Sequence, residues 1–148
     1  MTTVLAPVAG RVVGLAAVPD PVFSHGLVGL GTAIDPARVP GVAVAPIDGT
    51  VAKLHAHAYV IVGGDGRGVL VHLGIDTVEL RGEGFRVLAT EGRRVRAGTP
   101  IVAWNPALVE AGGRSPMCPV IALDAQPDAV ALVTTGNVRA GERLFAWD

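Results

Sequence analysis

The chain is poor in cysteine and in aromatic residues, and neither charge sign is in excess. Its one cysteine, Cys118, excludes an internal disulfide framework and indicates a reducing setting. Its 12 Lys and Arg residues almost balance 13 Asp and Glu residues, for a net charge of −1. The nearest approach to a basic cluster is Arg93, Arg94 and Arg96, so we expect no nucleic-acid partner, which would need a broad basic face.

Long apolar runs are missing as well. The longest charge-free stretches, such as Pro21 to Ile34, are interrupted by Gly and His and are shorter than the roughly 20 residues of a membrane-spanning helix. The opening residues, Met-Thr-Thr-Val-Leu-Ala-Pro, contain neither the basic nor the apolar region of a signal peptide. We therefore expect a soluble, cytoplasmic protein.

Small and aliphatic residues are abundant instead. Of the 148 residues, 50% are hydrophobic but only 4% are aromatic, and 20 Gly and 11 Pro are spread along the chain. So many breakers exclude a long helical bundle, since each interior Gly costs ~1 kcal/mol and each Pro ~3 kcal/mol. High hydrophobicity with low net charge excludes disorder. The length predicts one domain, residues 1–148.

Short apolar runs bounded by Gly, Pro, Asp or Asn are typical of an all-β fold. One helix is expected, with Asn105 as N-cap, Pro106 at its first position and Gly112 at its end. A second, short helical turn is expected from Asp76, where an acidic variant of the capping box occurs. The expected strands are Arg11–Val18, Leu27–Ala33, Val42–Pro46, Thr50–Leu54, Ala58–Val62, Val69–Leu73, Arg86–Ala89, Ile101–Trp104, Val120–Leu123, Ala129–Thr134 and Arg143–Trp147.

Two segments of the sequence each occur twice. The pattern Ala-Pro-(Val/Ile)-x-Gly-x-Val-x-x-Leu is found at Ala6–Leu15 and again at Ala45–Leu54. The pattern Val-Arg-Ala-Gly, followed by an apolar run that ends in Ala-Trp, is found at Val95–Trp104 and at Val138–Trp147. These pairs predict an internally duplicated β architecture around a pseudo-symmetry axis, and two copies are too few for a solenoid.

Two of the four histidines are predicted to meet. The Asp-Gly pair at positions 65 and 66 suits the tip of a two-residue type I′ hairpin, because both positions need positive φ. That turn would place Tyr59 opposite His72, and His57 opposite Gly74. His57 and His72 would then share one face of the sheet as diagonal neighbours, with Cα atoms roughly 7–8 Å apart.

Paired histidines permit three kinds of chemistry. They can ligate a metal ion, with His55 and Asp76 completing a zinc site. They can act as general acid and base. One can also be a nucleophile whose phosphoryl adduct the other stabilises by a charge-assisted hydrogen bond. Two exposed histidines without a function are the fourth interpretation, and the spacing alone leaves all four open.

The stretch from Val71 to Phe85 reads Val-His-Leu-Gly-Ile-Asp-Thr-Val-Glu-Leu-Arg-Gly-Glu-Gly-Phe. It resembles the signature of the glucose-family IIA domain of the bacterial phosphoenolpyruvate-dependent sugar phosphotransferase system, in which the histidine matching His72 is phosphorylated. The family's second histidine lies fifteen residues upstream, where this chain has His57. Further segments match in order: Ala6-Pro7 to Gly10, Pro19–Phe23, Val28–Gly31, Ala45–Thr50 and Pro119-Val120.

The resemblance implies an antiparallel β-sandwich with the histidine pair in a shallow depression. It implies that the small phosphocarrier HPr phosphorylates His72 on Nε2 and that His72 passes the group to a cysteine of a IIB domain, while His57 stabilises the phosphohistidine. It implies no required cofactor, although certain relatives share a Zn²⁺ ion between the two histidines at a regulatory interface. Membrane contact is then expected only through the permease, since no amphipathic tail precedes the first matching segment.

Other residues receive roles from the same resemblance. Asp76 and Gly74 are expected to support the turn after His72. The loop before His57 is about two residues shorter than in enteric members and carries His55, for which exposure without a role is slightly favoured over tuning of the histidine pair. An apolar rim for protein docking is expected at Val22, Phe23, Val28 and Leu70.

Two alternatives to a phosphocarrier are kept. One is a zinc metallopeptidase of related β architecture with the ligands His55, His57, His72 and Asp76, although the order of its motifs would be reversed. The other is a regulatory interaction module without chemistry.

Overall fold

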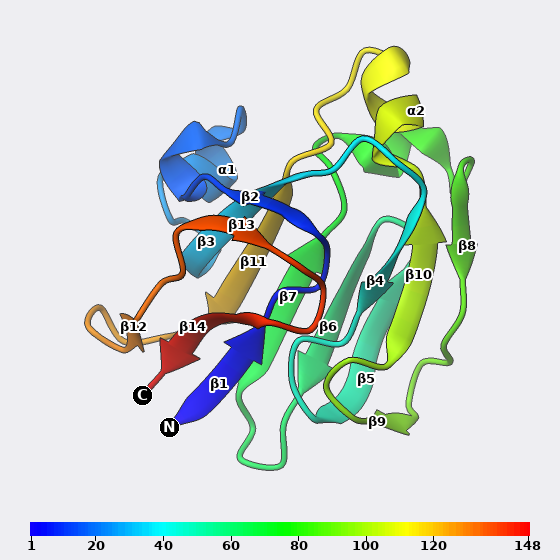
Figure 1. Cartoon of the computed structure of the whole chain (residues 1–148). Coiled ribbons are helices and arrows are strands. Elements are labelled where there is room, and N and C mark those ends of the chain that lie inside the picture. Colours follow the sequence, from blue (N-terminus) through cyan, green and yellow to red (C-terminus); the bar gives the residue numbers. More distant parts are fainter.

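The computed structural model describes residues 1–148 and consists mainly of antiparallel β-strands, with a few short helical segments (Figure 1). The strands are β1 (Thr2–Leu5), β2 (Gly10–Val12), β3 (Gly29–Pro36), β4 (Gly41–Val44), β5 (Gly49–His55), β6 (Ala58–Val62), β7 (Gly68–His72), β8 (Phe85–Val87), β9 (Arg94–Val95), β10 (Pro100–Trp104), β11 (Cys118–Leu123), β12 (Val130–Ala131), β13 (Gly136–Val138) and β14 (Arg143–Trp147). The helical segments are the 3₁₀ turns η1 (Leu15–Ala17) and η2 (Thr77–Leu80) and the helices α1 (Pro21–Ser24) and α2 (Pro106–Ala111).

Three antiparallel sheets enclose the main core. The largest has eight strands in the order β13-β2-β3-β11-β7-β6-β5-β9, and the others have the orders β1-β14-β12 and β4-β10-β8. The core contains 25 buried hydrophobic residues contributed by all three sheets. Tyr59 of β6 is one of them, and its hydroxyl donates a hydrogen bond of 2.7 Å to the carbonyl oxygen of Val44 in β4. The predicted all-β class is thereby confirmed.

The predicted duplication is visible in the strand pairing. β2 pairs with β13 at one end of the eight-stranded sheet, and β5 pairs with β9 at the other end. β1 pairs with β14, as β4 pairs with β10. The two copies also exchange reciprocal hydrogen bonds, from Leu5 N to Pro46 O and from Val44 N to Pro7 O, each 2.9 Å long. The repeated sequence patterns therefore form equivalent elements about a pseudo-twofold axis.

Several predicted boundaries were wrong. The strand expected over Arg11–Val18 ends at Val12, because the chain turns at Gly14 into η1. The strand expected over Ala129–Thr134 is reduced to β12, and three short strands, β1, β9 and β13, were not expected. α1 was missed too, although Asp20 caps it through Oδ1, which accepts from Val22 N at 2.9 Å, and Pro21 occupies its first position.

The hairpin between β6 and β7 differs from the predicted type. Gly63 N donates to Arg67 O and Gly66 N to Gly63 O, so three residues form the loop in place of two. The register therefore shifts by one residue, and His72 lies opposite Ala58 in place of Tyr59. Because side chains alternate along a strand, this shift turns Tyr59 into the core and leaves His72 on the other face of the sheet.

A second, smaller core lies on the same face of the sheet as His72. It consists of Val18, Phe23, Ala33, Ile75 and Ile121, with Leu70 and Val28 packed against it. These residues come from the segment around η1 and α1, from the strands β3, β11 and β7, and from the turn after β7. The chain around α1 therefore covers the sheet beside the end of β7.

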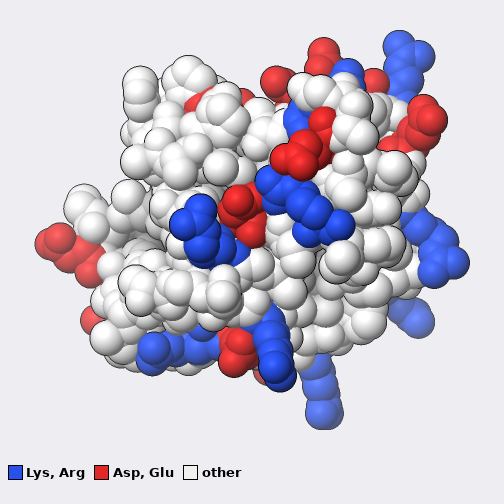
Figure 2. Space-filling view, turned by 45° about the horizontal axis from the view of Figure 1, so that its top comes forward, with Lys and Arg blue, Asp and Glu red and all other residues white.

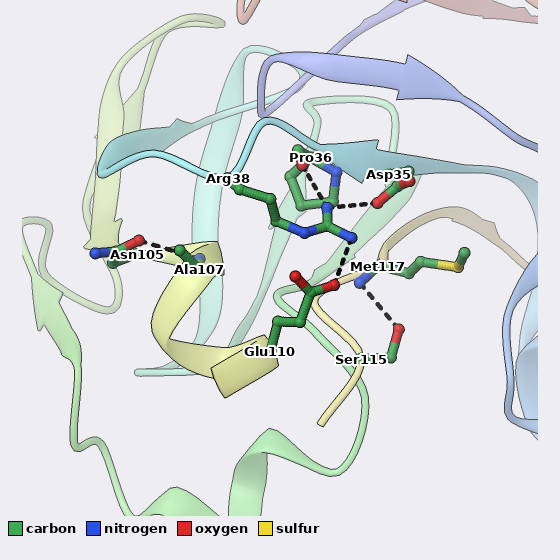
Figure 3. A network of polar contacts seen from close by, with 8 residues as sticks. All are labelled: Asp35, Pro36, Arg38, Asn105, Ala107, Glu110, Ser115 and Met117. Atoms are coloured by element: carbon green, nitrogen blue, oxygen red, sulfur yellow. Dashed lines mark hydrogen bonds and ion pairs between the residues drawn. The ribbon is translucent and has the colours of Figure 1, made fainter. Parts of the chain in front are cut away.

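The helix α2 is held against the loop after β3 by a network of polar contacts (Figure 3). The guanidinium of Arg38 donates from Nη1 to Asp35 Oδ1 and to Pro36 O, both at 2.6 Å, and from Nη2 to Glu110 Oε2 at 2.9 Å. The helix begins as predicted, with Asn105 Oδ1 accepting from Ala107 N at 3.1 Å.

On the face drawn in Figure 2, Lys and Arg side chains lie beside Asp and Glu side chains, with wide uncharged areas between them. No helix has the length and apolar character needed to cross a membrane.

Candidate functional site

His72 is the last residue of β7, and its ring is fixed by the turn that follows. Its Nδ1 lies 2.5 Å from the carbonyl oxygen of Gly74. A carbonyl oxygen can only accept a hydrogen bond, so Nδ1 carries the proton, and the neutral ring has its lone pair on Nε2. The sequence from His72 to Gly74 therefore selects the tautomer whose Nε2 is nucleophilic.

The turn after His72 is built from hydrogen bonds and one left-handed glycine. Gly74 has φ +84°, and a Cβ there would meet the Thr77 side chain at 2.6 Å and Ser115 O at 3.0 Å. The hydroxyl of Thr77 donates to Leu73 O at 2.8 Å, and Ile75 N donates to Ser115 O at 2.9 Å. Gly74 thus supports the site as predicted, and its carbonyl group additionally orients the His72 ring.

The carboxylate of Asp76 forms no hydrogen bond in this turn, and Asp76 takes part through its backbone, whose carbonyl oxygen accepts from Glu79 N at 3.2 Å. Asp76 is exposed, has φ 60°, and its carboxylate caps no backbone N–H of η2. The side-chain hydrogen bond of the turn comes from Thr77, which is fully buried and donates to Leu73 O. A hydroxyl four residues after its carbonyl partner forms a compact turn of this kind, and that spacing was available in the sequence.

His57 meets His72, as predicted, but by a different route. It occupies the second position of a two-residue turn between β5 and β6, where His55 pairs with Ala58. Its carbonyl oxygen accepts from Leu73 N at 2.7 Å, which ties the turn to the residue after His72. The ring centroids of His57 and His72 are 5.3 Å apart with an interplanar angle of 74°. The turn, and not the alternation along a strand, brings the two rings together.

Both histidines of the pair favour the neutral form. Burial lowers the pKa of His72 below its ordinary value of 6.5, while the hydrogen bond to Gly74 and the carboxylates of Asp20 and Asp76 act in the opposite direction. Burial is also the main cause of the lowered pKa of His57, with the charges of His72 and His55 adding to it. At neutral pH, His72 therefore presents an unprotonated Nε2.

His55 contacts the histidine pair, although the sequence slightly favoured an exposed residue without a role. Its exposed ring stacks on that of His57, with centroids 5.7 Å apart and an interplanar angle of 28°. The three imidazoles thus form a row, although no group of three or more His, Cys, Asp or Glu side chains is arranged to hold a metal ion. The four-ligand zinc set of the peptidase alternative is therefore not assembled.

The four expected rim residues divide into two kinds. Val22 is 46% exposed, whereas Phe23 is only 7% exposed and packs against the His72 ring with centroids 5.2 Å apart. Val28 and Leu70 are half-buried beside the smaller core. Phe23 is thus turned inward by α1 and contacts the His72 ring, which leaves Val22 as the exposed member of the expected rim.

Two exposed apolar side chains near these segments were not singled out from the sequence. Leu27, after α1, is 73% exposed, and Val78, in η2, is 60% exposed. None of the five main surface cavities is lined by His55, His57 or His72. The histidine row is therefore not part of any of these five cavities.

Comparison with known proteins agrees with the resemblance in sequence. The glucose-specific EIIA component of Haemophilus influenzae is 36% identical over 143 residues, which cover 95% of this chain and 85% of that protein. The N-acetylglucosamine-specific EIICBA component of Klebsiella pneumoniae is 37% identical over 143 residues, 95% of this chain and 22% of that protein. The solved structure of glucose permease IIA from Mycoplasma capricolum has a TM-score of 0.87 at 29% identity, covering 97% of this chain and 93% of that one.

A family model, described as phosphoenolpyruvate-dependent sugar phosphotransferase system, EIIA 1, matches residues 2–127. This match covers most of the chain, and the relatives listed above align over nearly all of it. The chain therefore belongs to the EIIA 1 family of the phosphoenolpyruvate-dependent sugar phosphotransferase system.

Proposed function

We propose that this member of the phosphotransferase system accepts a phosphoryl group on Nε2 of His72 from phospho-HPr and passes it to a cysteine of a IIB domain. The observation that carries the proposal is the hydrogen bond between His72 Nδ1 and Gly74 O, 2.5 Å long. It keeps the proton on Nδ1 and the lone pair on Nε2, so the ring needs no proton transfer before it attacks phosphorus.

In the first step, the Nε2 lone pair of His72 forms a bond to phosphorus while the bond between phosphorus and HPr breaks. The electron pair of the broken bond leaves with HPr, and His72 keeps its Nδ1 proton. In the second step, a IIB cysteine thiolate attacks phosphorus, and the electron pair of the Nε2–P bond returns to His72. Such transfers depend mainly on positioning and on electrostatic stabilisation, and neither step consumes a cofactor.

His57 is the residue proposed to stabilise the phosphoryl group. Its ring lies 5.3 Å from that of His72, and a ring N–H can donate to a phosphoryl oxygen in a charge-assisted hydrogen bond. The same interaction would favour departure of the group toward the IIB cysteine.

Val22 is the exposed member of the proposed docking rim, with Val28 and Leu70 beside it. We place this exchange in the cytoplasm.

The test is a reconstitution with HPr, its upstream kinase and labelled phosphoenolpyruvate. The unaltered chain should take up label, and His72→Gln should take up none. His57→Gln should take up label but transfer it slowly to the IIB domain. Label on His72→Gln, or none on the unaltered chain, would refute the proposal, and normal transfer from His57→Gln would refute the role of His57.

A further inference from the structure

The ring of His57 has no hydrogen bond to hold it, unlike that of His72. The Nδ1 of His72 is bound to Gly74 O, whereas neither ring nitrogen of His57 has a partner within the chain. Its backbone is fixed by the bond from Leu73 N, but no hydrogen bond restricts rotation of the side chain. What orients this ring must therefore be a packing contact.

Two rings supply that contact. The edge-on ring of His72 lies on one side, and the ring of His55 is stacked on His57 at 5.7 Å with an angle of 28°. These centroid distances fall in the range of favourable aromatic pairs. The short turn is what permits the stack, because His55 and His57 are separated only by Ala56 and their backbones reverse direction there.

We propose that His55 is a positioning residue that orients the His57 ring for phosphoryl transfer, an inference that rests on the proposed phosphocarrier function. A hydrogen bond from His57 to a phosphoryl oxygen on His72 depends on the direction of the donor N–H. Loss of the stack leaves the donor in place but lets its direction vary. Because His55 makes no hydrogen bond of its own, the flat face of its ring is what acts, and another aromatic ring can replace it.

The experiment measures transfer of label from the phosphorylated chain to the IIB domain for His55→Ala, His55→Asn and His55→Phe. We expect about two- to tenfold slower transfer for Ala and Asn, as the loss of one aromatic pair implies, and near-normal transfer for Phe. In the His57→Gln background, His55→Ala should have no further effect, because His55 acts only through His57.

Normal transfer by His55→Ala, or failure of His55→Phe to restore it, would overturn the inference. An equal additional loss in the His57→Gln background would overturn it as well, since His55 would then act by another route. If the unaltered chain takes up no label from phospho-HPr, the proposed function itself fails. The two failures are distinguishable because uptake of label from phospho-HPr tests the proposed function, whereas transfer of label to the IIB domain tests the role of His55. Every His55 variant should still take up label.

Discussion

At the scale of single residues, His72 combines a proton held at Nδ1 with a lone pair at Nε2 that nothing in the chain engages. The carbonyl group of Gly74 holds the proton, and burial disfavours the charged ring. A histidine without these neighbours would be partly protonated near neutral pH and could carry its proton on either nitrogen. The Gly74 carbonyl and burial together therefore favour a neutral His72 ring with its lone pair on Nε2, which is the form that the proposed function requires.

The first prediction concerns pH. His72 binds its proton less tightly in the folded chain than in the unfolded chain, where its pKa is near 6.5. Above pH 6.5 the ring is mostly neutral in both states, so its titration contributes little change in stability. As the pH falls from 6.5 through the lower pKa of the folded state, the unfolded chain binds the proton more readily and the free energy of unfolding decreases. NMR titration of the His72 ring should give a midpoint below 6.5, and uptake of label should fall less between pH 7.5 and 6.5 than the protonation of a free imidazole would imply. A midpoint at or above 6.5 would contradict this.

The second prediction concerns Gly74. Replacement by Ala places a Cβ 2.6 Å from the Thr77 side chain at a left-handed φ, so Gly74→Ala should lower the free energy of unfolding by about 1–3 kcal/mol and slow the phosphorylation of His72. Urea denaturation measures the first effect, and label uptake measures the second.

Gly141→Ala is the matched control, since Gly141 has φ +91° but no atom within 4 Å of the Cβ position. It should cost about 1 kcal/mol through backbone strain and leave phosphorylation unchanged. If Gly74→Ala behaves like this control in both measurements, the Gly74 turn does not orient His72.

At the scale of elements, the turn between β7 and η2 is the feature that fixes the position of His72. Thr77 closes it with a buried hydrogen bond, and Ser115 O, in the loop after α2, accepts from Ile75 N. The Arg38 network holds α2, the helix that precedes this loop (Figure 3). The position of His72 therefore depends on segments far from it in the sequence.

The third prediction tests this turn. Thr77→Val keeps the shape of the side chain but leaves the buried Leu73 carbonyl without its partner, so it should cost about 1–2 kcal/mol of unfolding free energy. Thr77→Ser keeps the hydroxyl and should cost less. Urea denaturation of both variants decides the point, and a larger loss for Ser than for Val would show that the methyl group, not the hydrogen bond, holds the turn.

Predictability from sequence also differs between elements. The N-cap and proline that identified α2 at Asn105 and Pro106 also occur at Asp20 and Pro21, so α1 could have been found by the same rule. The duplicated pattern could likewise have indicated β1, because its counterpart β4 precedes the second copy. The hairpin register could not be derived, since Gly-Gly-Asp-Gly allows both a two- and a three-residue loop, and packing of Tyr59 in the core selects one.

The candidate site also contains features that the sequence predicts and features that depend on packing. The meeting of His57 and His72 was predicted correctly although its route was wrong. His57 lies in the turn after β5, and that turn is hydrogen-bonded to the residue after His72, so the rings meet without sharing a strand face. The inward position of Phe23 and the stack of His55 on His57 depend on tertiary packing, for which the local sequence carries no signal.

At the scale of the whole molecule, the duplicated halves enclose one core and leave the histidines at its edge. The strands β5, β6 and β7 carry inward side chains such as Tyr59 and Val71, while His72 and Leu70 lie on the other face. The same sheet thus stabilises the fold with one face and carries His72, the proposed phosphoryl acceptor, on the other. This division is compatible with the proposed exchange of a phosphoryl group between docked proteins.

The fourth prediction tests the independence of the two faces. Tyr59→Phe removes the buried hydrogen bond to Val44 O that joins two sheets, and should lower the free energy of unfolding by about 1–3 kcal/mol. Label uptake on His72 should be unchanged at a temperature where the variant is folded. Reduced uptake by folded Tyr59→Phe would show that the core and the site are coupled.

The central claim is that the Gly74 carbonyl directs the phosphoryl group to Nε2 of His72. Its most direct test is NMR of the chain phosphorylated by phospho-HPr, with ¹⁵N-labelled histidine, to identify the nitrogen that is coupled to phosphorus. We expect coupling to Nε2 of His72 alone, with the Nδ1 proton still hydrogen-bonded to Gly74 O. Coupling to Nδ1, or to a nitrogen of His55 or His57, would contradict it.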